Sequence, residues 1–86
     1  MSKYLGIDPG RSKTGLALVD SEGKILALHI AQTENILAEL RSFAGKEVLS
    51  AVVMGNGTNH EAIGEAACKV FPAVRLELVG EAHSTE

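Results

Sequence analysis

Side chains able to do chemistry gather in three short segments of this 86-residue chain, and each segment follows an apolar run. They are Asp8-Pro-Gly-Arg-Ser-Lys13, Gly55-Asn-Gly-Thr-Asn-His60 and Gly80-Glu-Ala-His-Ser-Thr85. A carboxylate at the end of a buried strand, beside a Gly-rich loop, suits a divalent cation or a phosphate. Asp-Pro-Gly is also ordinary turn chemistry, in which the Asp8 carboxylate accepts a hydrogen bond from its own backbone. Taken alone, the first segment leaves both interpretations of Asp8 open.

The apolar patterns around these segments predict strands. Residues 3–7, 14–19 and 24–31 are apolar runs joined by short turns, which is typical of an antiparallel meander. Pro9 fixes φ and Gly10 permits a positive φ, so we expect a turn after the first run. Gly23 suits the second turn, because a short hairpin turn needs a residue that tolerates a positive φ. Within the third run, His29 is predicted to be a side chain on a strand face near an edge and not a metal ligand, because no second ligand stands at metal-binding spacing.

Two amphipathic helices are predicted to follow, each leading into another strand. Thr33 is the expected N-cap of the first helix and Gly45 its end, with an apolar stripe that starts at Ile36. Thr58 and Glu61 fit a capping box at the start of the second helix, and Cys68 within it is expected to be buried. Strands are predicted at residues 47–54 and 74–79, the second as a half-exposed strand because it alternates.

The predicted order is therefore βββαβαβ, an α/β fold with a five-stranded mixed sheet in one domain spanning residues 1–86. Strands reached through a helix pair in parallel with an earlier strand, and the connecting crossovers are right-handed. The three polar segments should then meet at the carboxyl edge of the sheet. Ligands of open α/β sheets bind at that edge. Topology alone thus favours a site there.

Composition narrows the classes of function. A net charge of −3 and three aromatic residues argue against a protein that holds nucleic acid by a basic surface or by base stacking alone. A single cysteine rules out a disulfide within the chain. No apolar run approaches the length of a membrane span and the start lacks the pattern of a signal peptide, so we expect a soluble, cytoplasmic protein.

Three motifs carry a resemblance to a known family. In chain order, Gly6-Ile-Asp-Pro-Gly10 with Gly15, Met54-Gly-Asn-Gly-Thr58 and Val79-Gly-Glu-Ala-His-Ser-Thr85 resemble the YqgF-type domain of the ribonuclease H-like superfamily. The resemblance covers essentially the whole chain. This Holliday junction resolvase-like group includes nucleases proposed to trim ribosomal RNA precursors. It implies a ribonuclease H-like sheet with helices packed on it.

The resemblance also implies a site. It makes Asp8 and Glu81 the catalytic carboxylates and the ligands of Mg²⁺ or Mn²⁺, as two-metal cleavage of a phosphodiester requires. The residues that it suggests for holding substrate phosphates lie in the same three segments: Arg11, Lys13, Asn56, Thr58, His60 and His83. Backbone N–H groups at the start of the second helix would help to hold such a phosphate.

The chain also departs from the family pattern, because family members continue into another helix that carries a third catalytic aspartate. Two acidic ligands imply weak metal affinity, and the absent helix would uncover one face of the sheet. We therefore expect self-association into a homodimer.

Three functions stay open. The first is a metal-dependent nuclease acting on RNA, as in rRNA processing, or on branched DNA. The second is a catalytically inactive ribonuclease H-like module that binds nucleic acid or protein. The third is a nucleotide-binding fragment of the actin and sugar-kinase type, although those proteins place two such domains around the nucleotide.

Overall fold

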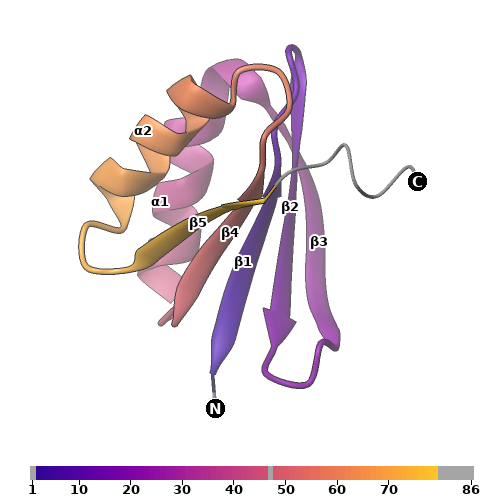
Figure 1. The fold of residues 1–86 in the computed structure, drawn as a ribbon, viewed down its shortest axis with the longest axis vertical. Coiled ribbons are helices and arrows are strands. Elements are labelled where there is room, and N and C mark those ends of the chain that lie inside the picture. Colours follow the sequence, from indigo (N-terminus) through magenta and orange to yellow (C-terminus); the bar gives the residue numbers. More distant parts are fainter. Residues whose placement is uncertain (1, 47, 80–86) are drawn as a thin grey trace.

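The computed structural model describes residues 2–46 and 48–79, which form one sheet with two α-helices (Figure 1). In chain order the elements are β1 (Lys3–Asp8), β2 (Lys13–Asp20), β3 (Ile25–Gln32), a 3₁₀ turn (Thr33–Asn35), α1 (Ile36–Lys46), β4 (Ala51–Gly55), α2 (His60–Val70) and β5 (Arg75–Val79). Within the described ranges, neither helix is long and apolar enough to cross a membrane.

The sheet has the strand order β3-β2-β1-β4-β5. β1 and β2, and β2 and β3, pair antiparallel, whereas β4 pairs parallel with both β1 and β5. The predicted meander, the mixed five-stranded sheet and the parallel placement of the last two strands are all confirmed. β1 is therefore the central strand, with the antiparallel half of the sheet on one side and the parallel half on the other.

Both helices pack on the same face of the sheet, where the core lies (Figure 1). Alternate residues of each central strand point to this face, so Leu5 and Ile7 of β1 are buried together with Leu16 and Leu18 of β2. The core is mostly aliphatic, as the scarcity of aromatic residues predicts, although Phe71 is buried in it and Phe43 packs against it. The helices contribute the buried residues Ile36, Leu40, Ile63 and Ala67.

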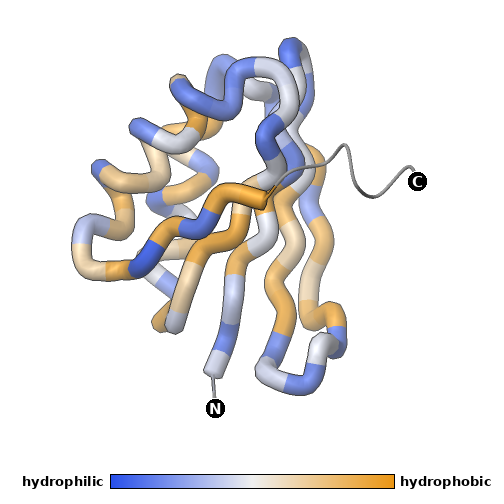
Figure 2. Tube along the Cα trace, in the orientation of Figure 1, coloured by the Kyte–Doolittle hydropathy of each residue, from blue (hydrophilic) through white to orange (hydrophobic). Residues whose placement is uncertain are grey.

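The opposite face of the sheet carries no helix in the described part of the chain. The strand registers place residues on this open face in rows, one of which joins Leu28 of β3 to Ala17 of β2 and to Gly6 of β1, which pairs in turn with Val53 of β4. Leu28 is 71% exposed. Figure 2 shows apolar residues along β3, the edge strand of the antiparallel half.

The helix starts and the start of β4 differ from the predictions. The hydroxyl of Thr33 does not cap α1 because it bonds Gly10 and Thr14, and α1 continues through Gly45 to Lys46. β4 begins at Ala51, which pairs with Tyr4 near the start of β1, and not at residue 47. The N–H of Ser50 just before it donates to the Lys3 carbonyl at 2.7 Å.

Two expectations for α2 are wrong. The helix begins after Asn59, which has the left-handed φ of 68°, so Glu61 falls one position too early to complete a capping box with Thr58. Cys68 is exposed and not buried, because it lies beside the stripe of Ile63 and Ala67 that faces the sheet.

Candidate functional site

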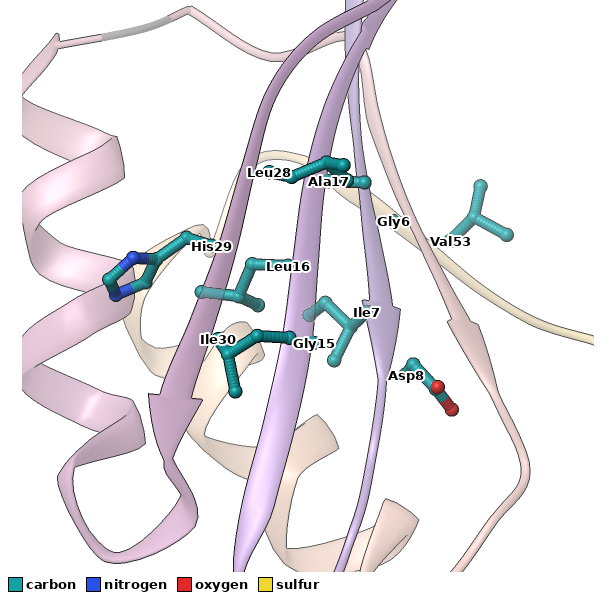
Figure 3. A pocket seen from close by; sticks show the side chains of 10 residues that line it. All are labelled: Gly6, Ile7, Asp8, Gly15, Leu16, Ala17, Leu28, His29, Ile30 and Val53. Carbon is teal, nitrogen blue, oxygen red and sulfur yellow. The ribbon is translucent and has the colours of Figure 1, made fainter.

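Asp8 is the last residue of β1, and its exposed side chain lies on the open face of the sheet (Figure 3). It pairs directly with Gly15 of β2, which pairs in turn with Ile30 of β3. A Cβ atom added at Gly15 would lie 3.5 Å from the Cβ of Asp8 and 3.8 Å from the Cδ1 of Ile30, which is ordinary van der Waals contact. Gly15 therefore leaves open space beside the Asp8 carboxylate.

That space belongs to an open hollow of about 590 Å³ (Figure 3). Small residues of β1 and β2 form its floor, and apolar side chains of β3 and β4 flank it: Gly6, Gly15, Ala17, Leu28, Ile30 and Val53. His29 belongs to the same segment, but its ring turns to the helix side, where its Nε2 lies 3.0 Å from Glu39 of α1. This geometry confirms that His29 is a side chain of an edge strand. Asp8 is the only carboxylate among the described residues that line the hollow.

The loop after Asp8 is fastened by Thr33, which the sequence did not single out for this role. The hydroxyl of Thr33 donates to the Gly10 carbonyl at 3.0 Å, and its N–H donates to the Ser12 carbonyl at 2.9 Å. The hydroxyl of Thr14, 2.8 Å away and fully buried, must then donate to Thr33, because the single hydroxyl proton of Thr33 is already engaged. These bonds hold both halves of the loop against the start of the 3₁₀ turn.

Gly10 is required in this loop for a reason other than the predicted positive φ. Its φ does not lie in the left-handed region; among the described glycines only Gly23 does, at 86°. A Cβ atom at Gly10 would instead collide with the carbonyl oxygen of Lys13. The tight approach of the two loop ends thus excludes a side chain at Gly10.

The loop after β4 reaches the same edge of the sheet as Asp8, because β1, β4 and β5 run parallel. The N–H of Asn56 donates to the Val79 carbonyl at 3.1 Å, which ties this loop to the end of β5. Thr58 is exposed in the same loop. His60 turns back on it, since its Nδ1 bonds the Gly57 carbonyl at 3.1 Å. The His60 ring therefore supports its own loop.

The two cations predicted to bind substrate lie in the first loop, and both are exposed. Lys13 stands two residues before Gly15 on β2, so it shares the open face with Asp8. Arg11 lines a separate shallow depression together with Ser12, Gln32 and Glu34. Of the two cations, Lys13 is therefore the one on the face of the Asp8 carboxylate.

The remaining predicted site residues, Glu81 and His83, lie outside the described residues. Within the described ranges, no group of three or more His, Cys, Asp or Glu side chains is placed to hold a metal ion. Asp8 thus supplies one hard oxygen ligand. Mg²⁺ usually binds through one or two carboxylates, so water and substrate phosphates would have to supply the remaining ligands of an ion held by Asp8.

Solved structures show what this arrangement of strands is similar to. The RuvC structure from Thermus thermophilus superposes with a TM-score of 0.75 and 21% identity, over 91% of this chain and 61% of that one. The fold is ribonuclease H-like. A ROK family protein from Streptococcus pneumoniae TIGR4, solved in complex with sucrose, gives a TM-score of 0.67 and 22% identity over 93% of this chain and 35% of that one.

A further similar structure is that of a putative sugar kinase from Cytophaga hutchinsonii ATCC 33406, with a TM-score of 0.63 and 16% identity over 94% of this chain and 36% of that one. The chain thus spans between about a third and three fifths of the length of these proteins. Identities this low show the fold alone. No protein-family profile matches the sequence, and no curated protein does. The assignment to the YqgF-type group within the ribonuclease H-like fold stays a prediction.

Proposed function

We propose that this chain is the ribonuclease H-like domain of a YqgF-type nuclease that cleaves RNA, such as a ribosomal RNA precursor, or branched DNA. The observation that carries the proposal is the position of Asp8. Its exposed carboxylate stands at the carboxyl end of the central strand, on an open face beside Gly15. The loop that follows β4 and the end of β5 meet at the same edge. In open α/β sheets, this edge is where ligands bind.

In this proposal Asp8 and Glu81 hold Mg²⁺ or Mn²⁺ together with the phosphate of the substrate. Bound divalent ions supply an activated water and stabilise the leaving oxygen of the phosphodiester. Lys13 lies on the Asp8 face and would hold a neighbouring phosphate. Other polar residues of the three loops would position the strand: Arg11, Asn56, Thr58, His60 and His83.

Two other functions are each favoured by a specific observation. The single carboxylate among the described residues of the hollow favours a ribonuclease H-like module that binds nucleic acid or protein without cleaving it. The likeness to a ROK family protein and to a putative sugar kinase favours a nucleotide-binding fragment in which the Asp8–Lys13 loop holds phosphate. We rank the nuclease first because the RuvC superposition has the higher TM-score and covers more of its partner.

Calorimetric titration of Mn²⁺ into the chain and into Asp8→Asn tests the metal site. Asp20→Asn is the matched control, because Asp20 ends β2 at the opposite end of the sheet, opposite Lys3. Its Oδ1 accepts bonds from the N–H groups of Glu22 and Lys24, and an asparagine keeps that acceptor. We expect saturable binding that Asp8→Asn and Glu81→Gln abolish and that Asp20→Asn retains. Equal Mn²⁺ affinity in all four proteins would overturn the metal site.

Activity assays then separate the three functions. Cleavage of a fluorescent single-stranded RNA or of a four-way DNA junction in Mg²⁺, lost in Asp8→Asn, would support the nuclease. Nucleic-acid binding without cleavage at any Mg²⁺ or Mn²⁺ concentration would favour the inactive module. Saturable ATP binding that Asp8→Asn weakens would favour the nucleotide-binding fragment.

A further inference from the structure

A polar depression of about 290 Å³ lies where the loop after β1 meets the end of β3. It is separate from the hollow beside Asp8, and four exposed side chains line it: Arg11, Ser12, Gln32 and Glu34. Among the described residues, neither Arg11 nor Glu34 has an ion-pair partner, and they do not pair with each other. One small surface thus presents a guanidinium and a carboxylate with a gap between them.

Thr33 holds the two walls of this depression together. Its hydroxyl and its N–H donate to the carbonyls on either side of Arg11, at 3.0 and 2.9 Å. In the chain, Thr33 is itself flanked by Gln32 and Glu34. These bonds therefore fix the backbone of the Arg11 wall against the backbone of the Glu34 wall before any ligand binds, which lowers the ordering cost of binding.

The depression lies near Asp8, at the same edge of the sheet. Asp8 pairs with Gly15 of β2, whereas Gln32 of β3 pairs with the residue two positions before Gly15. Asp8 and Gln32 are thus two strands and two residues apart, which is roughly 12 Å between Cα atoms in a sheet of standard geometry. Because a nucleic-acid strand rises about 3.4 Å per nucleotide, the depression lies a few nucleotides from a phosphate at Asp8.

Guanine is the base whose edges match these side chains. Its O6 and N7 accept bonds from the fork of an arginine, and its N1–H and N2–H groups donate together to one carboxylate. Adenine carries a donor at N6 and an acceptor at N1, so in the same orientation it would set donor against donor and acceptor against acceptor. Cytosine and uracil each offer a carboxylate one donor group. A guanine placed between Arg11 and Glu34 therefore uses both charges.

We propose that this depression binds a guanine base of single-stranded RNA, near the phosphate held at Asp8. The proposal rests on the proposed nuclease function and adds the base that the site selects. Glu34 accepts from N1–H and N2–H, and Arg11 donates to O6 and N7. Ser12 and Gln32 are left to bond the sugar and phosphate of the same nucleotide. The RNA is single-stranded because pairing would occupy the edge of guanine that Glu34 contacts.

Fluorescence anisotropy, in EDTA and again in Mg²⁺, measures this selectivity. The probes are labelled oligouridylates that carry one central guanine, one central adenine or neither. We expect the guanine probe to bind about 5 to 100 times more tightly than the adenine probe, as for other bidentate base contacts. Equal affinities would overturn the guanine site and leave the proposed nuclease function standing. Failure of every probe to bind would instead overturn both.

Two substitutions assign the selectivity to side chains. Glu34→Gln replaces one acceptor oxygen by a donor, and Arg11→Lys keeps the charge but removes the fork. Each should bring the guanine and adenine probes to equal affinity. Glu22→Gln is the matched control, because it makes the same change in the turn between β2 and β3, at the far end of the sheet. A guanine preference that survives in Glu34→Gln and Arg11→Lys would overturn the assignment.

Calorimetric titration of GMP tests whether the same base is instead taken from a free nucleotide. GMP lacks the neighbouring phosphates of a strand, so we expect it to bind much more weakly than the guanine probe. GMP that binds as tightly as the guanine probe, with an affinity that Glu34→Gln abolishes, would make this a free-nucleotide site and overturn the proposal of a strand.

Discussion

The hydroxyl groups of Thr14 and Thr33 lie 2.8 Å apart, and together they fasten the loop that follows Asp8. Thr33 alone reaches two carbonyl groups of that loop, those of Gly10 and Ser12. The geometry of the candidate site therefore depends on two residues that do not line the hollow beside Asp8.

Thr33→Val is expected to lower the free energy of unfolding by about 1–3 kcal/mol, because it leaves the buried Thr14 hydroxyl and the Gly10 carbonyl without this partner. Thr33→Ser keeps the hydroxyl and should cost much less. Thr14→Val should also cost less, since it removes a buried donor without orphaning the bond between Thr33 and Gly10. Urea denaturation of the three variants checks this ranking, and equal losses would show that the hydroxyl network does not contribute to stability.

Gly10→Ala is expected to destabilise the protein by about 1–3 kcal/mol, since the new methyl group would overlap the backbone oxygen of Lys13 and move the loop. Gly45→Ala is the control, because no described atom lies within 4 Å of a Cβ placed there. Gly45 lies within α1, so that substitution should stabilise the protein by about 0.5–1 kcal/mol. Thermal unfolding of both variants measures the opposite signs, and two shifts in the same direction would contradict the steric explanation.

Asn59→Gly should leave stability nearly unchanged, whereas Asn59→Ala should reduce it by about 1 kcal/mol. The reason is the φ of 68° at Asn59, which glycine and asparagine tolerate and alanine does not. Guanidinium denaturation distinguishes the two variants. Equal stability of the two variants would mean that the residue before α2 adopts an ordinary φ in solution.

Lys13→Gln should weaken binding of single-stranded RNA and lower the salt dependence of the affinity by about one ion, since Lys13 shares the open face with Asp8. Lys24→Gln is the matched control, because Lys24 lies in the turn between β2 and β3, where its N–H bonds Asp20 at the far end of the sheet. Fluorescence anisotropy at several salt concentrations measures both slopes. If the two variants lose affinity equally, the binding surface lies outside the Asp8 edge.

The strand order, the meander and the parallel half were predictable from the sequence, because they follow from local apolar runs and from the helices between them. The prediction that Asp8 lies at the same edge of the sheet as the loop after β4 follows from the same topology. The starts of α1 and α2 and the end of α1 do not follow from local apolar runs. The local pattern predicts Thr33 as a cap, yet its hydroxyl bonds residues 19 and 23 positions away. Local sequence carries no record of partners so distant.

The same limit explains what the sequence missed near the site. A threonine at position 14, within an otherwise apolar run, was a signal for a buried hydrogen bond, but its partner could be named only from the fold. Gly10 was recognised as a turn residue, although the structure requires it for close packing against Lys13 and not for its φ. Glu81 and His83 lie outside the described residues, so their roles stay predictions.

The central position of β1 bears on the order in which the chain folds. On one side β1 pairs with the next strand, as Asp8 does with Gly15, whereas on the other side Tyr4 pairs with Ala51. Contacts between distant segments form slowly, because a long loop must close before they contribute. We therefore expect β1, β2 and β3 to pair first during folding. Until β4 pairs with it, the other edge of β1 is unpaired. At that stage, a chaperone or a second chain could pair with the unpaired edge of β1.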